Sequence, residues 1–135
     1  MARNADDVET YLLNLGRTFE KREVNGSSAT FLITSPDTPV MAIRVAPPIV
    51  AINVNIGPTP TDEGHQLRFF RKLLELNASD LMHASYGLEN GSIVLSAALA
   101  LDNLDANELE ATLSDIDVAI VRHTKELAQI ARDGS

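Results

Sequence analysis

Residues 92–101 read Ser-Ile-Val-Leu-Ser-Ala-Ala-Leu-Ala-Leu, and their alternation predicts a β-strand with two unlike faces. Side chains point to opposite faces of a strand at successive positions. The odd positions from Ile93 to Leu101 place mostly bulky apolar groups on one face, and the even positions from Val94 to Ala100 place smaller groups on the other. We expect helices to cover the bulky face, and we expect the face of small side chains to let another surface come close.

Further strands are predicted on both sides of this one. Asn90-Gly91 is a preferred hairpin turn, so residues 81–88 are expected to form the partner strand. Residues 18–24 are a further short candidate strand. Three upstream runs have the length and the β-branched composition of strands, and they span residues 30–34, 40–45 and 49–56.

Helical periodicity marks three other segments. The first is capped by Asn4 or Asp6 and ends before Gly16, and the second covers about residues 65–77. The third follows Asp105, which can cap its first turn, and extends for roughly 25 residues. The apolar stripe of the second helix is predicted to consist of Leu67, Phe70, Leu73 and Leu74.

The order of these elements predicts an α+β fold. Helices packed on a largely antiparallel sheet of about five strands would follow from runs of strands divided by helices. The order along the chain is α-β-β-β-α-β-β-α. The length of 135 residues suits one core, so residues 1–135 are expected to form a single domain.

Composition and charge exclude several classes of function. The chain has no cysteine, which excludes disulfides, thiolate metal sites and a cysteine nucleophile. Its net charge is −8, so we expect no nucleic-acid partner, because phosphate contacts need clustered Lys and Arg. The excess of acids falls in residues 75–135, which suits either a solvated face or a basic partner. No apolar run is long enough for a signal peptide or a membrane span, so we expect a cytoplasmic protein without membrane insertion.

The residues that carry catalytic chemistry do not converge in the sequence. The three histidines lack metal-ligand spacing, and Asp102 and Asp105 precede a helix, where carboxylates stabilise exposed N–H groups. We therefore expect no enzyme, and no catalytic residue, cofactor or metal. A small hydrolase or isomerase that uses His83 with an acid remains an alternative hypothesis.

Three strings in the second half of the chain resemble a known group of proteins. They are Leu73-Leu74-Glu75-Leu76-Asn77-Ala78, Tyr86-Gly87-Leu88-Glu89-Asn90-Gly91-Ser92-Ile93-Val94-Leu95 and Leu99-Ala100-Leu101-Asp102-Asn103-Leu104-Asp105. These strings, followed by a long helix, resemble the Tir-chaperone-like superfamily, which includes the type III secretion chaperones and the YbjN-like proteins. The predicted order of elements is similar to that of the secretion chaperones.

The resemblance implies a non-enzymatic homodimer that captures an extended segment of a client protein, either by β-strand addition or through apolar pockets. The implied dimer contacts lie on the second helix and neighbouring strands, at Leu73, Leu76, Leu81, Val94, Ser96 and Ala98. The implied client contacts are Ile43, Val45, Ile52 and Val54. Each of these residues also suits an ordinary place in the core.

The YbjN-like branch of the resemblance implies a different activity. There the protein is expected to be a regulatory or stress-associated module that binds a small ligand or a protein partner. A pocket between the sheet and the helices would favour that alternative.

Overall fold

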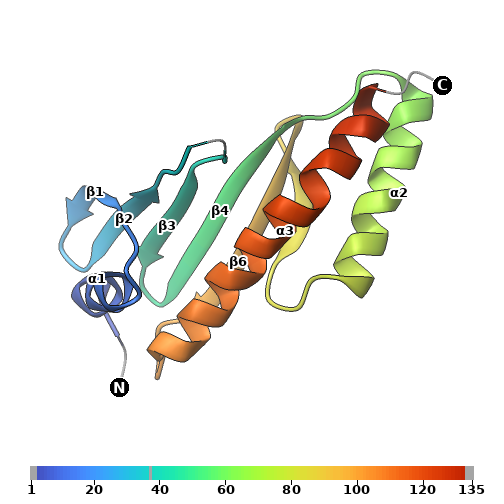
Figure 1. The fold of residues 1–135 in the computed structure, drawn as a ribbon. Helices are drawn as coiled ribbons and strands as arrows, with labels where there is room; N and C mark the ends of the chain where they lie inside the picture. Colours follow the sequence, from blue (N-terminus) through green and yellow to red (C-terminus); the bar gives the residue numbers. More distant parts are fainter. Residues whose placement is uncertain (1–2, 37, 133–135) are drawn as a thin grey trace.

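The computed structural model describes residues 3–36 and 38–132. Three helices and six strands are found in these residues (Figure 1). In chain order they are α1 (Ala5–Asn14), β1 (Glu20–Asn25), β2 (Ser28–Ile33), β3 (Met41–Ala46), β4 (Ile49–Pro58), α2 (Glu63–Ser79), β5 (Ser85–Glu89), β6 (Ser92–Ala100) and α3 (Ala106–Arg132). The α+β fold class is as the sequence predicts, and the order of helices and strands differs from the predicted one only by an additional strand before α2.

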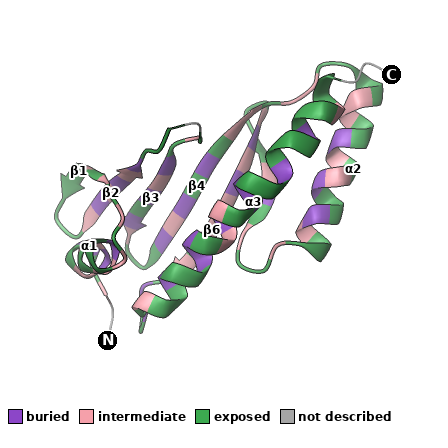
Figure 2. Cartoon of the chain, in the orientation of Figure 1, coloured by how far each residue is buried: buried purple, intermediate pink, exposed green. Residues whose placement is uncertain are grey.

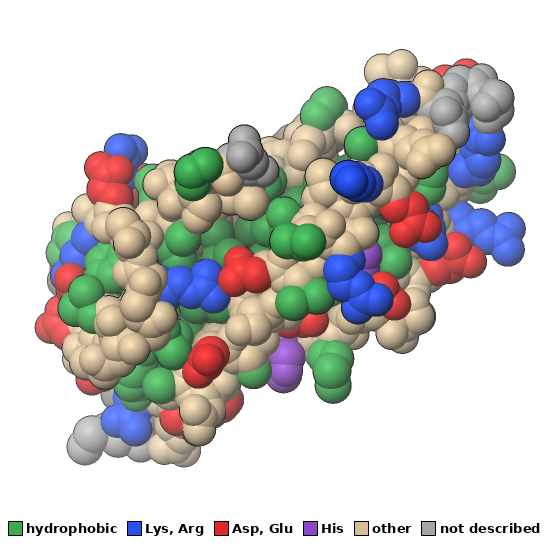
Figure 3. All heavy atoms as spheres, in the orientation of Figure 1, with side chains coloured by type: hydrophobic (Ala, Val, Ile, Leu, Met, Phe, Trp, Pro, Cys, Tyr) green, Lys and Arg blue, Asp and Glu red, His purple; other side chains and the backbone are tan. Residues whose placement is uncertain are grey.

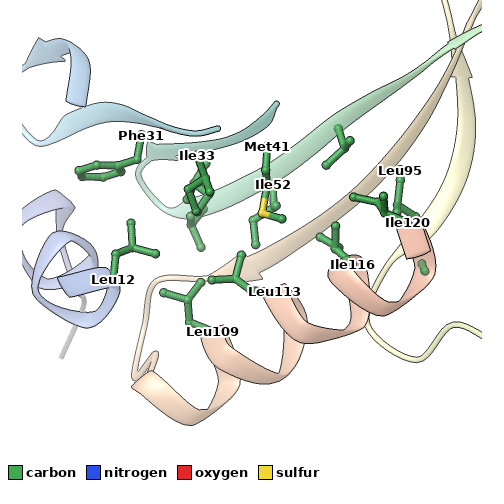
Figure 4. Packing of buried hydrophobic residues seen from close by; sticks show 14 of the residues in the cluster. Leu12, Phe31, Ile33, Met41, Ile52, Leu95, Leu109, Leu113, Ile116 and Ile120 are labelled. Carbon is green, nitrogen blue, oxygen red and sulfur yellow. The ribbon is translucent and has the colours of Figure 1, made fainter. Parts of the chain in front are cut away.

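All six strands form one antiparallel sheet in the order β1-β2-β3-β4-β6-β5. The pairing of β4 with β6 joins the two halves of the chain. Helices α1 and α3 cover the same face of the sheet, and Figure 4 shows Leu12 of α1 and Leu109, Leu113 and Ile116 of α3 directed toward Phe31 and Ile52. Helix α2 lies beside α3 and contacts β5 (Figure 1).

The register confirms the two unlike faces predicted for residues 92–101. Val54 is paired with Leu95 on the helix-covered face, whereas Asn53 is paired with Ser96 on the other face. The side chains of Val54 and Leu95 have no exposed surface, and buried and more exposed residues alternate along the strands in Figure 2. An antiparallel sheet can leave one face in water, because its alternating pattern supplies polar or small groups there.

The sheet has one strand more than expected, and the strand before the hairpin is shorter than expected. Residues 20–25 pair with β2, which makes them the sixth strand. Of the predicted strand 81–88, only the part from Ser85 pairs with β6. The backbone N–H groups of Met82, His83 and Ala84 instead donate to Asp115 Oδ2, at 3.2, 2.9 and 3.1 Å. One carboxylate of α3 therefore takes the donors that a strand would have used.

The apolar stripe predicted for the second helix is wrong at two positions. The residues of α2 buried in the core are Phe69, Leu73 and Leu76. Leu67 and Leu74 are 72% and 69% exposed. Helix α2 carries apolar residues on two faces, and only the face directed toward the core is covered.

Candidate protein-interaction surfaces

An exposed apolar ridge runs along the outer face of α2. Leu67, Phe70 and Leu74 follow one another at spacings of three and four residues, which places them on the same side of a helix. Phe70 is half-buried, since it packs partly against the core, and the two leucines are exposed. We call these three residues the α2 ridge. Large apolar side chains grouped on one exposed face are typical of surfaces that contact another protein.

The six candidate dimer residues do not lie on one surface. Leu73 and Leu76 point into the core of the chain, at 5% and 4% exposure, and Leu81 is half-buried. Val94, Ser96 and Ala98 lie instead on the uncovered face of the sheet, where Ala98 is exposed. Their role in a dimer stays a prediction. The sequence signal for the α2 ridge was present, but both apolar faces of the helix have the same periodicity.

A groove of about 290 Å³ lies between α3 and the segment that joins β2 to β3. Ile33, Met41 and Ile120 supply its buried apolar residues, and Val121 beside them is 76% exposed. We call this hollow the β2–α3 groove. At the margin of the groove, Arg17 Nη2 and Asp117 Oδ2 form an ion pair of 2.8 Å. This ion pair links the segment that follows α1 to α3.

The four candidate client residues lie on the same face of the sheet as this groove, beneath the helices. Ile43, Val45, Ile52 and Val54 have no exposed surface. Met41, two positions before Ile43 on β3, lines the β2–α3 groove. A client that enters the groove would therefore meet Met41, and contact with the four deeper residues would need the helices to move. Their role in client binding stays a prediction.

Side chains of two helices cover part of the outer edge of β5. Asn77 on α2 accepts the backbone N–H of Tyr86 at 2.7 Å and donates to the Tyr86 carbonyl at 3.1 Å. Asp115 on α3 binds the N–H of Ala84. These are the groups through which an added strand would have to pair. Strand addition is therefore obstructed along this part of β5.

The opposite edge of the sheet, β1, is irregular and charged. The register shifts between Arg22 and Asn25, where Glu23 has a φ of 52°. Lys21 on this strand forms an ion pair of 2.8 Å with Glu9 of α1. Bulges and charged side chains on an edge strand both disfavour the addition of another strand.

A partly buried chain of hydrogen bonds joins the end of α2 to α3 and β5. His123 is 3% exposed, and its Nδ1 lies 2.8 Å from the Tyr86 hydroxyl and its Nε2 lies 3.0 Å from Asp80 Oδ2. Burial raises the pKa of Tyr86 far above its usual value, so the hydroxyl keeps its proton. Because a neutral imidazole has one donor and one acceptor nitrogen, this hydroxyl can donate to Nδ1. The His123 Nε2–H then donates to the Asp80 carboxylate. A hydroxyl that keeps its proton in this way is a poor nucleophile. The three linked residues instead connect the end of α2, α3 and β5 by hydrogen bonds.

The histidine of the catalytic alternative has a different environment. The His83 side chain is exposed, and its contact with Asp115 is made by the backbone N–H. Among the residues that the structure describes, no group of three or more His, Asp and Glu side chains could hold a metal ion. Of the helices in the described part of the chain, none is long and apolar enough to cross a membrane.

Comparison with known proteins places this fold in a family. The family model CesT_Tir_1 matches residues 1–133. The chain belongs to the CesT_Tir_1 family. No curated protein is similar enough in sequence to count as a match.

Solved structures share the CesT_Tir_1 fold with this chain at low sequence identity. A chain of the heterodimeric complex ExoU–SpcU from the type III secretion system of Pseudomonas aeruginosa is 18% identical, with a TM-score of 0.66 over 91% of this chain and 96% of that one. YbjN from E. coli, a putative transcription regulator, is 14% identical, with a TM-score of 0.66 over 93% and 95%. The structure of the Yersinia pestis type III secretion chaperone SycH in complex with a stable fragment of YscM2 is also similar. The identity is 13%, and the TM-score is 0.59 over 87% of this chain and 96% of that one. The predicted resemblance to secretion chaperones and YbjN-like proteins is confirmed.

Proposed function

We propose that this CesT_Tir_1 protein is a non-enzymatic homodimer that holds an extended segment of a client protein, as a secretion chaperone does. The observation that carries the proposal is the α2 ridge, an apolar surface on the outer side of a helix whose inner side is already buried. The SycH structure contains a chaperone with a fragment of a second protein, which supports the same kind of role here.

The α2 ridge suits contact between two copies. In a two-fold dimer the same patch meets itself, so Leu67 of one protomer would lie near Leu74 of the other. Removing each leucine from water would stabilise the dimer by about 1.5–3 kcal/mol before the costs of association are subtracted. The surrounding Arg68, Arg71 and Glu75 would supply the polar rim that such interfaces have.

The client is proposed to bind at the β2–α3 groove through apolar side chains. Both outer edges of the sheet disfavour strand addition, whereas the groove leaves Val121 open to contact. Of the two modes of capture expected from the sequence, pockets for side chains therefore suit this chain better. An extended segment that contributes apolar side chains would cover Val121 and the edges of Ile33 and Met41.

Replacing Leu74 by glutamate should convert the dimer into monomers. A charge on each ridge would have to be buried twice in the two-fold interface, so the dissociation constant should rise at least about 100-fold. Sedimentation equilibrium over a range of protein concentrations measures this change. The matched control is Leu13→Glu on α1, where a leucine of similar exposure lies outside the ridge, and this variant should remain a dimer. A wild-type protein that stays monomeric at every concentration would contradict the proposal.

Replacing Val121 by glutamate should weaken the capture of a client without changing the dimer. The tagged wild-type protein, used as bait in an extract of its own cells, should retain one dominant protein identified by mass spectrometry. Val121→Glu should retain much less of it, because a charged group at the groove opposes burial of apolar side chains. Val24→Glu, on exposed strand β1, serves as the control and should retain the wild-type amount. Equal retention by both variants would show that the groove is not the client site.

The regulatory, YbjN-like alternative is compatible with the same fold. The TM-score to YbjN equals that to the ExoU–SpcU chain, so the fold does not separate the two functions. It stays a prediction from the sequence.

A further inference from the structure

A second groove, lined almost wholly by apolar groups, lies at the other end of the helical layer. Its volume is about 310 Å³, and it is bounded by the end of β4, by α2 and by the last turns of α3. Phe69, Ile93 and Leu127 form a buried floor, with exposures of 4%, 1% and 3%. Thr124 and Arg132 are the polar residues among those that line it. We call this hollow the α2–α3 groove.

The groove exists because α3 presents small side chains to it. Ala128 and Ala131 lie on the wall and are exposed. They are spaced so that, with Leu127, they share one side of the helix. A leucine at either alanine would extend over the buried floor. Apolar floor residues thus remain reachable from solvent beside the last turns of α3.

The two helical segments that bound this groove carry a small net positive charge, opposite in sign to that of the rest of the chain. Residues 63–80 and 119–132 hold six of the eleven Lys and Arg residues but only four of the nineteen Asp and Glu residues. One of these cations, Lys72, already forms an ion pair of 2.8 Å with Glu126, which leaves five others. In Figure 3, Lys and Arg side chains lie over α2 and the C-terminal half of α3, with Asp and Glu side chains among them. Arg132 lies at the groove itself. Part of this bias suits the negative end of the α3 dipole, but that effect does not require an open apolar floor beside it.

We propose that the α2–α3 groove binds an acidic segment of a partner protein and takes up one apolar anchor side chain from it. The apolar floor accounts for the anchor, and Arg132 together with the positive excess of the two bounding helical segments accounts for the acidic residues on either side. The inference rests on the proposed function, because it gives the chemistry of a second contact between this chain and the protein it holds. The groove is separate from the α2 ridge and from the β2–α3 groove, which share none of its lining residues.

Two synthetic peptides of equal length test the proposal directly. Both carry one central leucine, flanked by glutamates in the first peptide and by lysines in the second. Titrated into the full-length protein, the glutamate peptide should shift the NMR signals of the Ala128 and Ala131 methyl groups, and added salt should weaken its binding. The lysine peptide should leave these signals in place. The inference is overturned if both peptides shift them equally or if neither shifts them.

Variants identify the groove as the site. Ala128→Leu should lower the affinity for the glutamate peptide at least about tenfold, because the new side chain occupies the place of the anchor. Arg132→Ala should lower it about two- to fivefold, as expected for one exposed ion pair. Ala111→Leu, at another exposed alanine of α3, should bind as the wild type does, and circular dichroism checks that all three fold. Wild-type affinity in Ala128→Leu would overturn the inference.

The same samples separate this inference from the proposed function. If the protein is a monomer and binds the glutamate peptide at Ala128, the proposed homodimer is contradicted and the proposed groove site is supported. If the protein is a dimer and its Ala128 and Ala131 signals respond to neither peptide, the proposed groove site is contradicted and the proposed homodimer is supported.

Discussion

Replacing Phe31 by alanine should lower the free energy of unfolding by about 3–5 kcal/mol. The Phe31 side chain has no exposed surface, and its ring meets that of Phe19 edge-to-face, with 5.3 Å between the centroids. Leu12 of α1 is directed toward the same region (Figure 4). The substitution therefore leaves a cavity at the place where α1 rests on β2. Urea unfolding followed by circular dichroism measures the change.

A surface leucine of α1 provides the control for Phe31→Ala. Leu13→Ala changes a residue that is 61% exposed, and the free energy of unfolding should change by no more than about 0.5 kcal/mol. If Phe31→Ala costs less than about 1 kcal/mol, α1 is not held on the sheet as the structure shows. The candidate client residues Ile43 and Val45 would then be easier to reach than their burial indicates.

Replacing His123 by alanine should lower the free energy of unfolding by about 2–4 kcal/mol. The change removes a buried ring and leaves the Tyr86 hydroxyl without its acceptor in the region between α3 and β5. Tyr86→Phe, which removes the other partner of that hydrogen bond, should cost about 1–3 kcal/mol. Because the two residues share one bond, the double variant should cost less than the sum of the single ones, as a double-mutant cycle in urea would show.

The dependence of stability on pH gives an independent measure of the same chain of hydrogen bonds. The hydrogen bond from His123, and a second from Ser79, hold the pKa of the Asp80 carboxyl below its usual value. A carboxyl whose pKa is lower in the folded state stabilises the protein above its unfolded pKa. That contribution disappears as the pH falls through the folded-state pKa. Asp80→Asn should therefore lose less stability than the wild type on acidification, and parallel curves would contradict this assignment.

The parts of the fold that depend on neighbouring residues could be predicted from the sequence. The alternation of residues 92–101 predicts both faces of β6, and the Asn90-Gly91 turn predicts its pairing with β5. The cap of α3 is also confirmed, since the Glu108 N–H donates to Asp105 Oδ1 at 2.8 Å. These features are set by local backbone geometry and by side-chain period, which a single sequence displays.

Features that depend on distant contacts could not be predicted in this way. Residues 82–84 have strand composition, yet a carboxylate more than thirty positions away in the chain takes their donors. The two apolar faces of α2 have equal periodicity, and only the place of α3 decides that Leu73 is covered and Leu74 is not. The pairing of His123 with Tyr86 and Asp80 likewise has no local signal, because both partners are distant in the chain. The sequence alone therefore does not distinguish His123 from the other histidines.

The two hydrogen bonds between the Asn77 amide and the Tyr86 backbone have a consequence for aggregation at high protein concentration. A sheet with bare borders can recruit further chains one above another and grow into fibrils. Here side chains occupy part of one border, and the other is kinked and charged. This protein is proposed to bind extended polypeptides. Its sheet edges are poor templates on which those polypeptides, or further copies of the chain, could add as strands.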